Sequence, residues 1–117
     1  MSKIVLSRIG SRADKRIMNP HLAAVMKSKE QSFDVTIIDI SRNGLRFRSK
    51  NQYDKGDKLM FELNSDDSTK DLSISIKAKL VNVYGDQPEG FYDYGVKFLR
   101  FHYWYEMNRI HDYVYTH

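Results

Sequence analysis

Hydrophobic and polar positions alternate through the middle of the chain with the two-residue period of a half-buried β-strand. The run 33–37 follows this pattern and leads directly to Asp39. A turn signal, Asn43-Gly44, comes next, and the run 45–48 then alternates apolar residues with arginines. The two runs therefore predict a β-hairpin that carries Asp39 and the residues after it to its tip.

Further runs with the same alternation predict more short strands. The polar and turn-forming loop 85–90 separates the last two of them. Short strands at this spacing are typical of a small antiparallel barrel or sandwich. The predicted strands outside the hairpin begin with His21 to Met26 and continue at 59–63, 72–80 and 94–101.

The hydrophobic period changes at the C-terminus, where apolar positions recur every three or four residues. This spacing predicts an amphipathic helix that packs on the barrel. Its inward positions are predicted to be Trp104, Met107, Ile110, His111 and Val114. We therefore expect a single domain with a flexible basic arm at 1–17, a β-barrel at 18–101 and a C-terminal helix at 102–117.

Length and composition restrict the class of protein. A chain of 117 residues has room for one hydrophobic core and favours a binding module over a large enzyme. No apolar run approaches the roughly 20 residues of a membrane span, and the N-terminus lacks a signal-peptide core. Cysteine is absent, which excludes disulfides and cysteine-based zinc sites and fits a reducing compartment. We expect a cytoplasmic protein without membrane insertion.

Positive charge is concentrated at the start of the chain. Through Gln31 there are seven basic residues against two acidic ones, whereas the remainder has 12 against 13. A basic segment on a nearly neutral body attracts anions and accelerates their capture, although such a segment can also serve only as a solubilising tail.

Two groups of residues form the candidate binding site. Arg12 and Arg16 lie four positions apart, and guanidinium forks at this spacing bind phosphate bidentately or stack on a base. Asp39 and Ser41 supply a carboxylate and a hydroxyl, and Gly44 allows a backbone angle that a side chain would oppose. This combination predicts a site for a phosphorylated guanine ligand.

In this order, the two groups resemble the signature of the PilZ family of bacterial cyclic di-GMP receptors. That signature is R-x-x-x-R, followed some twenty to thirty residues later by [DN]-x-S-x-x-G. The first element is filled by Arg12 and Arg16, the second by Asp39, Ser41 and Gly44, and the resemblance continues through 94–98. Arg8 forms an overlapping R-x-x-x-R with Arg12, which leaves the register open; Arg12 and Arg16 are preferred because the apolar Ile17 follows them.

The resemblance implies a six-stranded antiparallel PilZ-type barrel with a terminal helix. It also implies a receptor that binds cyclic di-GMP without chemistry and needs no other cofactor. By the family's pattern, Arg12 and Arg16 bind phosphate and one guanine edge, and Asp39 and Ser41 meet the other edge. Gly44 acts through its backbone, and Arg8 assists. The arm would fold over the barrel and signal to an unidentified protein partner that controls motility, exopolysaccharide synthesis or biofilm formation.

Three other interpretations fit parts of the sequence. The Asp-x-Ser-x-x-Gly segment is often only a turn that bonds its own backbone. Some PilZ domains are ligand-free protein adaptors, although these typically lack the arginines. The aromatic residues of 91–105 also allow a stacking platform for single-stranded nucleic acid, but basic residues are not interleaved with them.

No pattern indicates catalysis or a metal site. The four histidines are scattered, and neither a nucleophile elbow nor a phosphate-binding G-x-x-x-x-G-K loop occurs. We therefore expect a protein that is not an enzyme.

Three further arginines, Arg42, Arg46 and Arg48, are interpreted as solvent-facing residues of the hairpin.

Overall fold

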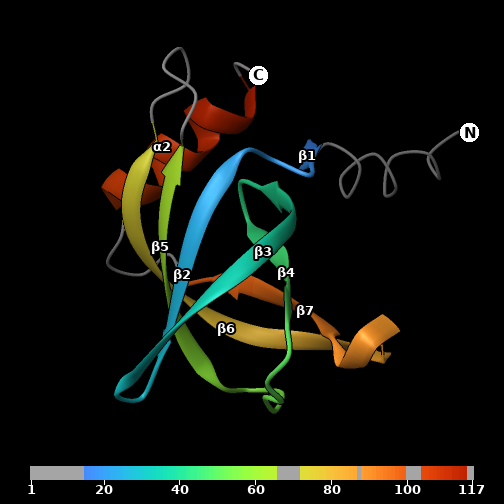
Figure 1. The fold of residues 1–117 in the computed structure, drawn as a ribbon. Coiled ribbons are helices and arrows are strands. Elements are labelled where there is room, and N and C mark those ends of the chain that lie inside the picture. Colours follow the sequence, from blue (N-terminus) through green and yellow to red (C-terminus); the bar gives the residue numbers. More distant parts are fainter. Residues whose placement is uncertain (1–14, 66–71, 87, 100–103, 116–117) are drawn as a thin grey trace, which may run out of the picture.

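A computed structural model describes residues 15–65, 72–86, 88–99 and 104–115, which form a β-barrel with a helix at one end (Figure 1). The elements are β1 (Arg16–Met18), β2 (Leu22–Ser28), β3 (Gln31–Ser41), β4 (Gly44–Ser49), β5 (Lys58–Ser65), β6 (Ser73–Asp86), the short 3-10 helix η1 (Pro88–Gly90), β7 (Tyr92–Phe98) and α2 (Trp104–Tyr115).

Six of the strands close into an antiparallel barrel. Neighbouring strands follow the order β3, β2, β5, β6, β7 and β4, and β4 pairs again with β3. Closure leaves no unpaired sheet edge around the barrel, which removes a common route to aggregation. The predicted six-stranded antiparallel barrel with a C-terminal helix is therefore confirmed.

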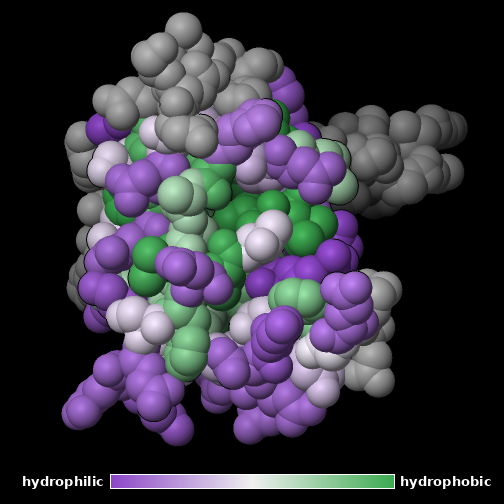
Figure 2. Space-filling model, in the orientation of Figure 1, coloured by the Kyte–Doolittle hydropathy of each residue, from purple (hydrophilic) through white to green (hydrophobic). Residues whose placement is uncertain are grey.

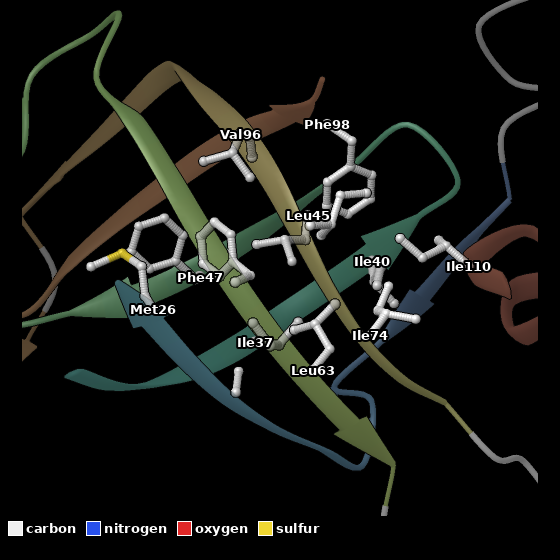
Figure 3. Packing of buried hydrophobic residues seen from close by; sticks show 14 of the residues in the cluster. Met26, Ile37, Ile40, Leu45, Phe47, Leu63, Ile74, Val96, Phe98 and Ile110 are labelled. Carbon is white, nitrogen blue, oxygen red and sulfur yellow. The ribbon is translucent and has the colours of Figure 1, made fainter. Parts of the chain in front are cut away.

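The barrel interior holds the apolar residues that alternate along each strand. Figure 3 shows Ile37, Leu45, Phe47 and Val96 pointing into this core from β3, β4 and β7. Phe47 is fully buried and packs edge-on against Phe61 of β5, with ring centroids 5.2 Å apart.

On the face seen in Figure 2, hydrophilic residues surround a hydrophobic area in the middle.

The helix α2 covers one end of the barrel and contacts β3 and β6. Ile110, Tyr113 and Val114 are buried on its inner face. His111 was predicted to lie on this face but is exposed and stacks on Tyr115, with ring centroids 4.6 Å apart. At about 100° per residue, positions 110, 113 and 114 share one face and 111 lies at its flank. The side chains of Trp104 and Met107 lie outside the described residues.

The short strand β1 extends the sheet beyond the barrel. It pairs antiparallel with the end of β3, so that Arg16 lies opposite Ser41 and Met18 lies opposite Asp39. Arg16 and Ile17, which the hydropathy pattern leaves in the basic arm, belong to this strand. β1 therefore brings Arg16 to the hairpin formed by β3 and β4 (Figure 1).

Candidate ligand-binding site

A groove of about 490 Å³ lies on the outside of the barrel, beside the turn between β3 and β4. Its volume is within the range that small ligands occupy, roughly 300 to 1,000 Å³. Four parts of the chain line it: Arg16 and Met18 of β1, Asp39 to Arg46 of the β3–β4 hairpin without Ile40 and Arg42, Val81, Asn82 and Tyr84 of β6, and Gly95 to Lys97 of β7. The groove thus joins predicted site residues to residues from the opposite end of the chain.

A β-bulge in β3 directs Asp39 toward this groove. The register with β4 shifts between Ile37 and Asp39, which makes Ile38 the extra residue. Ile37 and Ile40 are both buried in the core (Figure 3), so the inward face changes from odd to even positions across the bulge. Asp39 consequently lies on the outer face opposite Arg46, as expected for bulges that redirect a side chain at a functional site.

Asp39 holds two arginines through its two carboxylate oxygens. Arg16 Nη1 lies 2.5 Å from Oδ1, and Arg46 Nη2 lies 3.0 Å from Oδ2. The Asp39 side chain is only 4% exposed, so it needs these partners to offset its desolvation. Together, Asp39, Arg16 and Arg46 carry one net positive charge. The two ion pairs orient both guanidinium groups at the groove, and this arrangement attracts an anion.

Ser41 organises the turn between β3 and β4. Its hydroxyl accepts a hydrogen bond from the backbone N–H of Asn43 at 3.3 Å and lies 3.4 Å from the carbonyl oxygen of Gly44, to which it donates. Ser41 is buried, and these local bonds are those of a serine turn. Ser41 therefore maintains the hairpin that carries Asp39.

Gly44 is needed for space rather than for an unusual backbone angle. The glycines with positive φ among the described residues are Gly56, Gly85 and Gly90. A Cβ on Gly44 would instead lie 2.1 Å from the carbonyl oxygen of Val96 in β7. The expectation from the sequence was wrong on this point, because the close approach of two strands cannot be read from one segment.

Arg46 is a member of the site, although its place in an alternating strand indicated a solvent-facing residue. Besides its ion pair with Asp39, its guanidinium carbon lies 5.2 Å from the centroid of the Tyr84 ring. Its Nε is buried and has no hydrogen-bond partner. The signal that was available is the hairpin itself, since its strands run back from the turn and place Arg46 opposite Asp39.

Tyr84 was missed because it is 38 residues from Arg46 and belongs to no motif. Its ring lies over Gly95, where an added Cβ would be 3.2 Å from the hydroxyl oxygen. Gly95 itself lies opposite both Arg46 and Asn82 in the sheet. The missing side chain at Gly95 therefore makes room for an aromatic ring beside the arginine.

Arg48 and Arg42 do not line the groove. Arg48 forms a bidentate pair with Asp93, at 2.7 Å from Nε and 3.0 Å from Nη2, and this hydrogen bonding raises the pKa of Arg48. It was expected to face solvent, and its side chain is 36% exposed, but the buried Asp93 on β7 requires it as a cationic partner. Arg42 is exposed at the turn, as expected.

Arg8 and Arg12, the other predicted ligand arginines, lie outside the described residues. Within the described residues no cluster of three or more metal-ligating side chains occurs. No described helix has the length and hydrophobicity that crossing a membrane requires.

The closed barrel, its C-terminal helix and its arginine-lined groove define a small β-barrel domain with a basic surface site. The family model described as "PilZ domain" matches residues 11–115. The chain therefore belongs to the PilZ domain family.

Solved structures have the same fold at low sequence identity. The inhibitor of motility of Bacillus subtilis (MotI/DgrA) has a TM-score of 0.70 at 11% identity, over 88% of this chain and 48% of that one. MrkH of K. pneumonia in its apo state has a TM-score of 0.69 at 20% identity, over 86% and 48%. The PilZ domain of YcgR from Escherichia coli has a TM-score of 0.65 at 9% identity, over 88% of each chain.

The chain thus spans about half the length of the first two of these proteins. No curated protein sequence matches it.

Proposed function

We propose that this PilZ domain is a receptor for cyclic di-GMP, which it binds in the arginine-lined groove without chemical conversion. The observation that carries the proposal is the pair of guanidinium groups that Asp39 orients, Arg16 at 2.5 Å and Arg46 at 3.0 Å. The ligand has two phosphates and two guanines. Arginine forks suit both, because they bind phosphate oxygens and the O6 and N7 acceptors of guanine.

The similar structures support this ligand. MrkH of K. pneumonia and the PilZ domain of YcgR are both described in complex with c-di-GMP. Carried over to this chain, the same ligand agrees with a complete R-x-x-x-R and D-x-S-x-x-G signature at Arg12, Arg16, Asp39, Ser41 and Gly44.

Arg16 and Arg12 are assigned to the phosphate and to one guanine edge, with Arg8 as a further cation. Asp39 has two tasks in this proposal: it orients Arg16 and accepts hydrogen bonds from the guanine amino and imino groups. Ser41 and Gly44 act through the turn, where their mutual hydrogen bond and the space against β7 keep Asp39 in position.

Binding is expected to draw the segment before β1 toward the barrel, because Arg12 precedes Arg16 by only four residues. The rearranged segment would present a new surface to a protein partner in the cytoplasm. Control of motility, exopolysaccharide synthesis or biofilm formation is the expected output. A nucleic-acid platform is less favoured, because Tyr94 and Phe98 are buried in the core.

Calorimetric titration of the purified protein tests the proposal. Cyclic di-GMP, GTP and a short oligonucleotide are titrated at two salt concentrations. Saturable binding of cyclic di-GMP, with much weaker binding of GTP, is the expected result. Arg12→Ala and Arg16→Ala should each weaken binding by about 2 kcal/mol or more, since truncation leaves charged partners unpaired.

Failure of cyclic di-GMP to bind would overturn the proposal and favour a ligand-free adaptor. Binding of the oligonucleotide with a steep salt dependence would instead identify a nucleic-acid module.

A further inference from the structure

We infer that Tyr84 is a base-stacking residue of the groove, which receives one guanine of the ligand and lies outside the PilZ sequence signature. This inference rests on the proposed function and adds to it a residue from β6. It starts from the exposure of Tyr84, whose side chain lines the groove and remains 47% exposed. A large exposed aromatic ring beside a phosphate-binding cation pair is the combination that binds nucleotide bases.

A second β-bulge places Tyr84 at the groove. The register between β6 and β7 shifts between Leu80 and Asn82, which makes Val81 the extra residue. Leu80 is buried in the core, so an unbroken strand would direct Asn82 and Tyr84 inward as well. The shift moves both to the outer face, where Asn82 lies opposite Gly95. The bulge in β6 thus turns the following side chains to the other face of the sheet beside the groove, as the bulge in β3 does at Asp39.

The ring of Tyr84 is supported before any ligand arrives. A Cβ built on Gly95 would lie 3.2 Å from the Tyr84 hydroxyl oxygen and 3.3 Å from Tyr84 Cε2, so the ring lies close to this glycine. Asn82 Nδ2 lies 3.5 Å from the same hydroxyl oxygen. The Arg46 guanidinium lies 5.2 Å from the ring centroid, within cation–π range. These contacts hold the ring at one place, which reduces the entropy lost when a base stacks on it.

Arg46 connects the aromatic ring to the signature. The same guanidinium contacts both the Asp39 carboxylate and the Tyr84 ring, and Asp39 also contacts Arg16. The base-stacking residue and the phosphate-binding arginine are therefore linked through two side chains. Arg46 acts as a positioning residue, because it contacts both Asp39 and the Tyr84 ring.

The test compares three variants with the wild type by titration with cyclic di-GMP. Tyr84→Leu removes the ring and should weaken binding at least tenfold, within the range measured for loss of one base stack. Tyr84→Phe keeps the ring and should bind within about threefold of the wild type, since only the long contact to Asn82 is lost. Phe91→Leu is the matched control, because Phe91 is also an aromatic residue beside a cation but does not line the groove. The centroid of its ring lies 5.1 Å from Lys50 Nζ.

A spectroscopic measurement accompanies the titration. Tyr84→Trp should retain binding, and ligand should quench its indole fluorescence more than that of the wild type, whose single tryptophan is Trp104. If the wild type binds cyclic di-GMP and Tyr84→Leu binds it with equal affinity, the stacking role alone is overturned. A wild type that fails to bind cyclic di-GMP would overturn the proposed function and the stacking role together.

Discussion

Asp39 and Arg16 are 23 residues apart in the chain, yet their side chains meet at 2.5 Å. The contact requires β1 to pair with the end of β3 and the bulge at Ile38 to direct Asp39 outward. It joins the two halves of the PilZ signature before ligand is present. The arginine of the site is therefore oriented in advance, which lowers the cost of ordering it on binding.

Replacing Asp39 should weaken both binding and folding. Asp39→Asn leaves two guanidinium groups close together without a counter-ion, so we expect at least a tenfold loss of affinity for cyclic di-GMP and a loss of about 1 to 2 kcal/mol in the free energy of unfolding. Calorimetry and urea denaturation measure the two effects. Asp34→Asn, at an exposed position on the same strand, should change neither, and wild-type affinity in Asp39→Asn would contradict the assigned role.

Arg46 and Arg48 should respond differently to the same substitution. They are two positions apart on β4, but Arg46 contacts Asp39 in the groove and Arg48 contacts Asp93 outside it. Arg46→Gln should weaken ligand binding by about tenfold, whereas Arg48→Gln should leave it unchanged and lower only thermal stability. Equal losses of affinity in both variants would indicate diffuse electrostatic attraction instead of a defined site.

Gly44→Ala should be strongly destabilising. Its Cβ would lie 2.1 Å from a backbone oxygen of β7, so β4 and β7 must move apart. We expect a loss of about 1 to 3 kcal/mol in the free energy of unfolding, measured by urea denaturation. Unchanged stability would show that the strands separate at no cost.

Gly95→Ala provides a contrasting case, in which the added Cβ on β7 meets side chains of β6. Here the nearest atoms belong to the Tyr84 side chain, at 3.2 and 3.3 Å, and a side chain moves more easily than a backbone. Stability should therefore change by less than about 1 kcal/mol, while displacement of the ring should weaken cyclic di-GMP binding several-fold. A large loss of stability with normal affinity would contradict this assignment.

Tyr94 should make folding sensitive to alkaline pH. Its hydroxyl donates to the carbonyl of Asn51 at 2.9 Å and accepts from the N–H of Tyr53 at 3.2 Å. Burial raises the pKa of the Tyr94 phenol above its ordinary value of about 10. The neutral phenol thus contributes stability that is complete below the unfolded-state pKa and is lost as pH rises through the folded-state pKa.

Tyr94→Phe tests this dependence by urea denaturation across the alkaline range. At neutral pH the variant should be less stable by about 1 to 2 kcal/mol, because two backbone groups lose a partner. The difference from the wild type should narrow as the pH rises above about 10, since the variant has no phenol to ionise at this position. A difference that stays constant across this range would contradict the raised pKa.

Much of the fold could be predicted because each strand satisfies its own hydrophobic period. The runs at 33–37, 59–63 and 72–80 are local patterns, and burial of their apolar faces requires a closed or layered sheet. The last turns of the helix were found in the same way, apart from His111, which lies at the flank of the buried face. The resemblance to the PilZ signature likewise implied that Arg16, Asp39, Ser41 and Gly44 belong to one site.

The rest of the site depends on register, which no single segment contains. Bulges at Ile38 and Val81 each move the following residues to the opposite face of the sheet, because side chains alternate with a period of two. The sequence by itself determined the family, the six strands of the barrel and the residues of the signature, because hydrophobic alternation and motif spacing are local properties of the chain. Only the tertiary structure decided that Tyr84 would lie beside Arg46, because this contact depends on β7, which is distant from β4 in the chain, pairing with both β4 and β6.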